Sequence, residues 1–157
     1  MRDFGEFYRR EYGQAVVTVA LALGDRHRAE EVVQEAFSRA YRRWRTVGRM
    51  ERPDAWVVVV AINAERRRFR SDRSTGTRSE LGLFVVDHAV TVVARVAVSE
   101  ALAELTERQR AAVVLRYLAD LPFADVASAL GCAETTARTT VHQALQKLRI
   151  EMEGEEL

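Results

Sequence analysis

The 157-residue chain has few of the residue types that build common catalytic and metal sites. Its single cysteine, Cys132, excludes a disulfide framework, and no cysteines and histidines have the spacing of a structural zinc site. The histidines (His27, His88 and His142) are widely separated, and the chain lacks a glycine-rich phosphate loop and a nucleophile elbow. We therefore expect no enzyme activity, no metal and no cofactor.

Long apolar runs are also missing. The longest, residues 15–23 and 55–62, are far shorter than the roughly 20 residues that a membrane-spanning helix needs. Acidic residues begin at Asp3, and no basic start followed by an apolar stretch suggests a secretory signal. With 48% hydrophobic and 30% charged residues, the chain can still bury a core. We expect a soluble, cytoplasmic protein with no membrane span.

The net charge is only +1, but the charges are segregated along the chain. Residues 26–70 carry twelve basic and six acidic side chains, whereas residues 81–157 carry seven basic and eleven acidic ones. Of the 24 basic residues only Lys147 is a lysine. Arginine suits phosphates and base edges, although a GC-rich genome is a simpler explanation for the preference. The asymmetry indicates a polyanion-binding site in the first half.

Apolar residues recur at three- and four-residue steps through most of the chain, which predicts an all-α fold. We expect helices over residues 4–23, 28–44, 54–70, 90–105 and 108–118, with Gly24 ending the first and a loop over residues 46–53. Four consecutive valines within residues 55–62 favour a strand by propensity. No partner strand is evident, however, and the continuation over residues 63–70 is helical in pattern, so a helix is predicted there.

The segment 121–148 predicts a helix-turn-helix. Pro122 opens a short helix, and Gly131 supplies the left-handed residue that a tight turn needs. The second helix is expected to turn its apolar residues inward: Ala137, Val141, Ala144, Leu145 and Leu148. Its outer side carries short donors and acceptors suited to phosphates and base edges: Thr135, Thr136, Arg138, Thr139, His142 and Gln143. A solvated helical hairpin is the alternative, but its outer face would normally carry Glu and Lys.

A second candidate site is the basic end of the helix predicted over residues 54–70. It combines Asn63 with Arg66, Arg67, Arg68 and Arg70. Arginines interleaved with aromatic residues, here Tyr41, Trp44, Trp56 and Phe69, can hold phosphates and stack unpaired bases. Taken alone, a basic helix end can equally serve to cap the helix dipole.

Residues 71–80 (SDRSTGTRSE) contain no apolar residue and are typical of a linker. We therefore predict two small helical domains, residues 1–70 and 87–157, joined by a flexible linker over residues 71–86, with the helix-turn-helix in the second domain. The acidic tail, residues 151–157, is expected to fray.

These segments together resemble a known family. The runs AEEVVQEAFSRAYRRW (residues 29–44) and DAWVVVVAINAERRRFR (residues 54–70) are similar to region 2 of the extracytoplasmic-function (ECF) sigma factors of the sigma-70 family. Residues 101–149 are similar to region 4, and the phrases GDRHRAEEVVQ and YRRW resemble the actinobacterial type. The resemblance implies a non-enzymatic, two-domain subunit that binds core RNA polymerase and directs promoter-specific transcription initiation.

The resemblance also implies roles for single residues. Region 4 would contact the −35 element of promoter DNA through the outer side chains of its second helix: Thr135, Thr136, Arg138, Thr139, His142 and Gln143. The loop over residues 46–53 would receive an unpaired base of the −10 element. Region 2 would contact the same element through six residues: Arg49, Trp56, Asn63, Arg66, Arg67 and Arg70. Three residues would bind polymerase: Glu31, Gln34 and Glu35.

The family often has Asp where Glu31 stands, a change that keeps the charge, and the other departures from its pattern concern region 4. The family often carries arginine near Thr140 and Gln143, and the second half of this chain is acidic. Weak DNA binding by region 4 alone is therefore expected, which suits a protein that acts only with polymerase; the acidic surface could instead contact polymerase or a regulator. An anti-sigma factor is a further partner that the family allows.

Two other functions fit parts of the sequence. A stand-alone helix-turn-helix transcriptional regulator would bind operators as a dimer, but no dimerisation helix or effector domain is evident. A helical interaction module, such as a sigma-binding antagonist, would not need Asn63 and the adjoining arginines.

Overall fold

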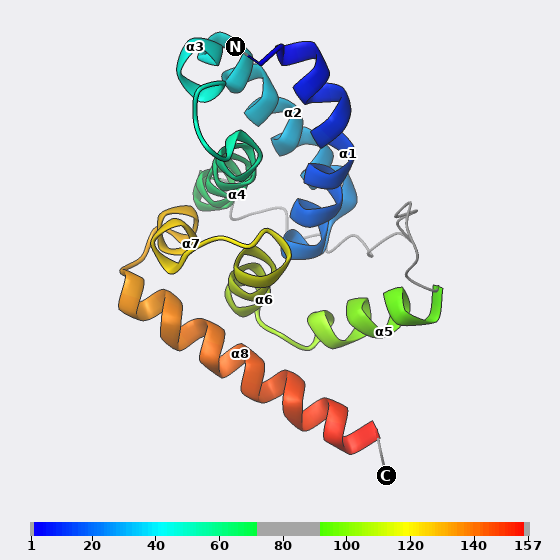
Figure 1. Ribbon diagram of the computed structural model, residues 1–157. Helices are drawn as coiled ribbons and strands as arrows, with labels where there is room; N and C mark the ends of the chain where they lie inside the picture. The colour runs from blue at the N-terminus through cyan, green and yellow to red at the C-terminus, as the bar shows by residue number, and fades with distance from the viewer. Residues whose placement is uncertain (1, 72–91, 156–157) are drawn as a thin grey trace.

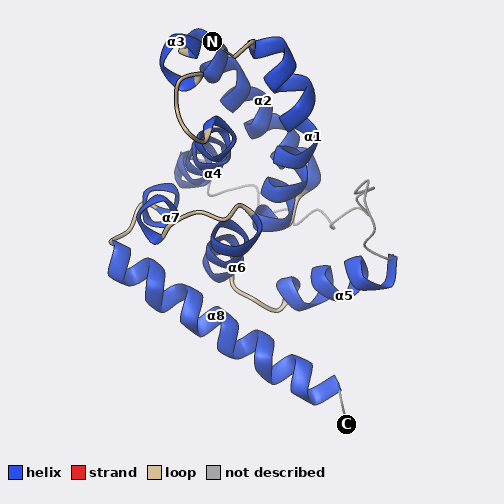
Figure 2. Ribbon diagram, in the orientation of Figure 1, coloured by secondary structure: helices blue, strands red, loops and turns tan. Residues whose placement is uncertain are grey.

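The computed structural model describes residues 2–71 and 92–155, and these are helical with connecting loops (Figure 2). The all-helical fold is as predicted. In chain order the elements are α1 (Phe4–Leu23), α2 (Arg26–Arg42), α3 (Trp44–Val47), α4 (Pro53–Ser71), α5 (Val92–Ala103), α6 (Glu107–Val113), the π-helix η1 (Val114–Leu118), α7 (Phe123–Leu130) and α8 (Glu134–Glu155). Most of the predicted linker, residues 72–86, lies outside the described residues.

Helices α1, α2 and α4 form the first bundle. The carboxylate of Asp3 accepts a hydrogen bond from the Glu6 amide at the start of α1, and Gly24 ends that helix with φ +73°. Asp25 caps α2 in the same way by accepting from the Arg28 amide. The valine-rich segment of α4 is helical because it is enclosed by α1 and α2, and Val57 is fully buried there.

Two predicted boundaries differ from the structure. The loop expected over residues 46–53 begins after the short helix α3, whose Val47 is buried. Trp44 anchors this turn, because its indole Nε1 donates to the Arg2 carbonyl at 2.7 Å. At the other end of the chain, residues 151–155 continue helix α8 rather than fraying.

The second bundle contains α5 to α8. Thr106 and Gln109 form a capping box that begins α6, and the helix then widens into the π-turns of η1. Gly131 joins α7 to α8 with φ +66°, as the helix-turn-helix prediction requires. Ala137, Val141 and Ala144 are buried as predicted. The prediction for Leu145 was wrong, because one residue beyond Ala144 the helix has rotated it out of the buried stripe, and it is 38% exposed.

The two bundles pack against each other. Helix α4 lies on α7, and the C-terminal part of α1 lies on α6, as Figure 1 shows. One connected cluster of buried apolar residues extends through both bundles. The packing between bundles brings residues more than 60 positions apart into hydrogen-bonding contact.

Candidate nucleic-acid interface

The outer face of α8 carries the six residues predicted to contact the −35 element, and all six are exposed. Helix α8 follows the turn at Gly131, so the first turns of the helix lie beside α7 (Figure 1). The hydroxyl of Thr139 donates to the Thr135 carbonyl at 3.0 Å. Thr140 makes the same bond to Thr136 at 2.8 Å, but is buried. The short side chains on this face leave space for a groove edge to approach the helix.

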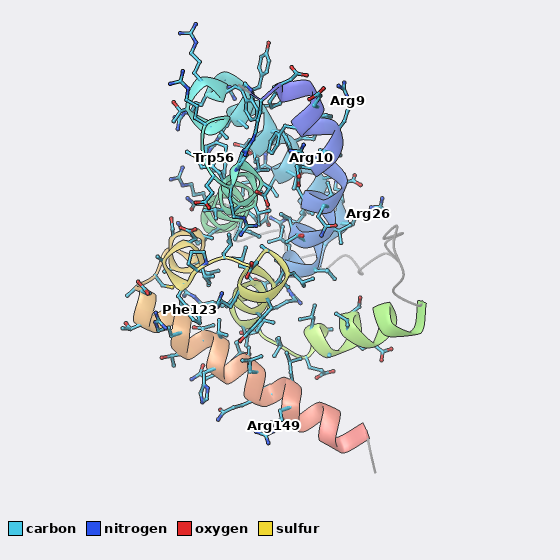
Figure 3. The ribbon with its side chains drawn as sticks, in the orientation of Figure 1. Arg9, Arg10, Arg26, Trp56, Phe123 and Arg149 are labelled. Carbon is cyan, nitrogen blue, oxygen red and sulfur yellow. The ribbon has the colours of Figure 1, made fainter. Side chains whose placement is uncertain are left out.

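Arg138 is held in place by two neighbours. Its guanidinium carbon lies 4.6 Å from the centroid of the Phe123 ring, and its Nη2 is 2.9 Å from Glu134 Oε1. Arg116 contacts the same ring, with 4.8 Å between its Cζ and the Phe123 centroid. Phe123, labelled in Figure 3, therefore lies beside two cations at the start of the helix-turn-helix. Such contacts fix the direction of an arginine while leaving its donors accessible.

Helix α4 carries most of the residues predicted to contact the −10 element. Trp56 and Asn63 are half-buried, and Arg67 is exposed. The Arg66 side chain turns back along the helix, and its Nη2 donates to Asn63 Oδ1 at 2.6 Å. The same guanidinium lies against Gly131 of the helix-turn-helix. The side chain of Arg70 lies outside the described residues. Helix α4 thus brings together Asn63 and Arg66, and the packing of the second bundle partly covers them.

The end of α2 and the helix α3 add basic residues that the sequence interpretation did not single out. Arg42, Arg43 and Arg45 are exposed near Arg49, which was predicted as a −10 contact. Tyr41 is 66% exposed, and its ring meets Phe4 edge-on at 5.1 Å. The sequence signal was the run YRRWR, which lies immediately before the predicted loop. This end of the first bundle offers guanidinium groups and an accessible aromatic ring, the combination that binds single strands.

The three residues predicted to bind polymerase lie on one face of α2. Glu31 and Gln34 are exposed and Glu35 is half-buried. Arg68 of α4 reaches both carboxylates, at 3.2 Å from Glu31 Oε2 and 3.4 Å from Glu35 Oε2. Gln34 Nε2 donates to the hydroxyl of Tyr12 at 3.1 Å. The face is therefore acidic, and its side chains are already ordered by contacts with α1 and α4.

A partly buried ion pair joins α2 to α4. Arg28 Nη2 is 2.7 Å from Glu65 Oε1, and Glu65 is 8% exposed. Burial raises the pKa of Glu65 above its usual value, and the positive charges of Arg28 and Arg68 only partly oppose that rise. The other carboxylate oxygen, Oε2, has no hydrogen-bond partner. Glu65 therefore holds the two helices together at an electrostatic cost.

Within residues 2–71 and 92–155, no three His, Cys, Asp or Glu side chains gather closely enough to hold a metal ion. Among the helices that the structure describes, none is both long and apolar enough to cross a membrane.

Comparison with known families matches both bundles. Residues 8–75 match Sigma-70 region 2, and residues 95–148 match Sigma-70, region 4. The first match covers most of α1 and all of α2, α3 and α4, and the second covers most of α5, all of α6 to α7 and residues 134–148 of α8. The two regions occur in this order in one chain.

Individual proteins extend the comparison over nearly the whole chain. The ECF RNA polymerase sigma factor SigL of Mycobacterium tuberculosis is 32% identical, over 91% of this chain and 85% of its own. The RNA polymerase sigma-E factor of Streptomyces coelicolor is 29% identical, over 99% and 89%. Among solved structures, the sigma factor RpoE in complex with the anti-sigma factor NepR, from Bartonella quintana, has the same fold, with a TM-score of 0.71, 20% identity and 98% of each chain covered.

Proposed function

The chain belongs to the ECF sigma factors of the sigma-70 family, and we propose that it directs core RNA polymerase to promoters through two separate DNA-contacting surfaces. The observation that carries the proposal is the presence of region 2 and region 4 in one chain. A sigma factor acts by binding and positioning and does no chemistry of its own. Because it works on polymerase and promoter DNA, its place of action is the cytoplasm.

The −35 element is the proposed ligand of α8. In this arrangement the first turns of α8 enter the major groove, and Arg138 offers a two-pronged donor to a guanine. The hydroxyls of Thr135, Thr136 and Thr139 contact phosphates or bases beside it. Glu134 and Phe123 support Arg138 from the protein side, at 2.9 Å from its Nη2 and 4.6 Å from its Cζ respectively.

The −10 element is the proposed ligand of α4 and of the loop that precedes it. Opening the duplex requires a surface that favours single strands, and exposed guanidinium groups beside aromatic rings provide one. Arg49 in the loop, Trp56 and Asn63 on α4, and the arginines that follow Asn63 would lie along the displaced strand. The exposed arginines at the end of α2 and in α3 extend the same basic surface.

The acidic face of α2 is proposed to bind polymerase through Glu31, Gln34 and Glu35. The carboxylates of Glu31 and Glu35 would pair with basic residues on the polymerase subunit. An anti-sigma factor is a further proposed partner, because the solved relative from Bartonella quintana was crystallised with one. A partner of that kind would control when the sigma factor reaches polymerase.

Run-off transcription tests the proposal. Core polymerase alone and core polymerase with this chain are supplied with a library of promoters, and the start sites are sequenced. We expect transcripts that require the chain and share −35 and −10 motifs. An operator-binding regulator would instead bind duplex DNA tightly without polymerase and give no core-dependent transcripts, which would refute the sigma-factor proposal.

A further inference from the structure

Arg68 belongs to the same helix as most of the proposed −10 residues, but its side chain contacts the proposed polymerase face. It follows Arg67 on α4, and its guanidinium reaches across to α2. Its Nη1 lies 3.2 Å from Glu31 Oε2, and its Nη2 lies 3.4 Å from Glu35 Oε2. One side chain therefore links two surfaces that are proposed to bind different partners.

The two carboxylates that Arg68 joins are one helical turn apart on α2. Like charges at positions i and i+4 of a helix repel each other, so Glu31 and Glu35 benefit from a cation between them. The other oxygen of each carboxylate is held within α2. His27 Nε2 is 3.2 Å from Glu31 Oε1. Arg39 Nη2 is 2.8 Å from Glu35 Oε1. Arg68 thus supplies the bridging cation from a second helix.

The bridge is accessible to a partner protein. The side chains of Arg68, Glu31 and Glu35 are 48%, 49% and 31% exposed. Exposed ion pairs contribute little stability, because water screens the charges and the long side chains lose freedom when they are held. A basic residue of a partner can therefore replace Arg68 at either carboxylate at small cost.

A cation from polymerase at this face would compete with Arg68 for the same oxygen atoms. Two cations repel each other at such short range, so the guanidinium is driven away as the carboxylates pair with the polymerase. Arg67, the residue before Arg68, lies four positions after Asn63 and shares a helix face with it. Both belong to the proposed −10 surface, where DNA phosphates attract a guanidinium within reach. The displaced side chain therefore adds its charge to that surface.

We propose that Arg68 couples polymerase binding to −10 strand binding, an inference that rests on the proposed function. In the free chain, Glu31 and Glu35 hold the guanidinium of Arg68. In the complex these carboxylates pair with polymerase, and Arg68 binds a phosphate of the −10 strand. The coupling is reciprocal, since a strand that binds Arg68 leaves both carboxylates available to polymerase.

The test measures strand binding with and without polymerase for wild type, Arg68→Gln and Arg67→Gln. The probe is a fluorescent single-stranded oligonucleotide that carries the −10 motif obtained by run-off transcription. It is titrated with the free chain and with the holoenzyme. Arg67→Gln is the matched control because it removes the same charge from the next position of α4. Arg67 is exposed, and no ion pair joins it to the described residues.

The two variants should differ in how their effect depends on polymerase. Arg68→Gln should weaken oligonucleotide binding by the holoenzyme about five- to tenfold, and change binding by the free chain less than about twofold. Arg67→Gln should weaken binding by about the same factor in both states. Equal effects of Arg68→Gln on the free chain and the holoenzyme would overturn the coupling.

Core polymerase binding without DNA separates the coupling from damage to the fold. Arg68→Gln should bind core polymerase about two- to fivefold more tightly than wild type, because Glu31 and Glu35 have lost a competing cation. A substitution that merely disturbed the packing of α4 on α2 would weaken binding to both partners. Weaker binding of core polymerase by Arg68→Gln would therefore overturn the coupling.

The carboxylate side of the bridge is tested in the free chain with Glu35→Gln and Glu30→Gln. Each removes one negative charge from α2, but Glu30 pairs with Arg26 at 3.1 Å. Glu35→Gln should tighten oligonucleotide binding about two- to threefold more than Glu30→Gln does. This difference should vanish when Arg68→Gln is also present. A difference that persists without Arg68 would contradict its role.

Run-off transcription by wild type, measured in parallel, distinguishes failure of the coupling from failure of the proposed function. If wild type directs promoter-specific transcription but the differences expected for Arg68→Gln are absent, only the coupling is refuted. If wild type directs no transcription with core polymerase, the proposed function is refuted and the coupling with it.

Discussion

Glu65 shows how one residue can hold two helices together at an electrostatic cost. Its carboxylate is buried, and only one oxygen has a partner, Arg28 Nη2 at 2.7 Å. Burial raises the pKa of Glu65 above 4.5, so the folded protein binds a proton there more readily than the unfolded chain. Protonation of Glu65 therefore favours folding.

The sign of this effect gives a pH prediction. The stabilisation from a raised pKa is fully present below the unfolded value of 4.5 and is lost as the pH rises through the higher, folded value. The free energy of unfolding of wild type, relative to Glu65→Gln, should therefore fall as the pH rises above 4.5. Urea denaturation of both proteins at several pH values between 4 and 7 measures this change. If the free energy of unfolding of wild type, relative to Glu65→Gln, instead grew with pH, the raised pKa of Glu65 would be contradicted.

At the scale of one element, contacts between neighbouring side chains organise the exposed face of the first turns of α8. Its base-contacting face is expected to depend on Arg138, which Glu134 and Phe123 hold in place. Arg149, labelled in Figure 3, lies on the same helix but far from its N-terminal turns and serves as a matched control. Comparing substitutions of these two arginines separates an effect on base recognition from an effect of positive charge alone.

Arg138→Ala should lose roughly 1–3 kcal/mol of discrimination at one −35 base pair. Run-off transcription with core polymerase on promoters that vary singly at each −35 position measures this loss. Arg149→Ala should lower transcription from all promoters by one common small factor. An unchanged promoter preference in Arg138→Ala would remove this residue from the −35 surface.

Helix patterns explain why most elements could be predicted from the sequence and others could not. The apolar stripes of α1 and α2 and the glycine turn of the helix-turn-helix depend on local spacing, and they were predicted. The π-helix η1 and the short α3 depend on packing against other elements, and local propensity does not reveal them. The partial covering of Arg66 is also a tertiary effect, since it arises from Gly131, which lies 65 positions away in the chain.

At the scale of the whole molecule, the two helical bundles are in contact within the described residues. The buried apolar cluster passes from the first bundle into the second, and Arg52 and Arg110 bind backbone carbonyls across the contact. Two bundles that share a core and hydrogen bonds should unfold together. The basic first half and the acidic second half of the chain are therefore packed against each other.

Cooperative unfolding can be measured with two probes that report on different parts of the molecule. Both tryptophans, Trp44 and Trp56, lie in the first bundle, so their fluorescence reports that bundle alone, whereas circular dichroism reports helices in both. The two urea transitions should coincide for wild type and separate for Arg110→Ala. Transitions that already differ in wild type would show that the bundles unfold independently.

Arg68 has a consequence for the strength of polymerase binding. It already pairs with Glu31 and Glu35 of the proposed polymerase face, at 3.2 and 3.4 Å. A basic partner at these carboxylates replaces one positive neighbour with another, so binding there is an exchange of counterions rather than a simple gain of two ion pairs. The released guanidinium takes up anions from solution in its turn. Polymerase binding through this face should therefore depend less steeply on salt than its number of carboxylates suggests.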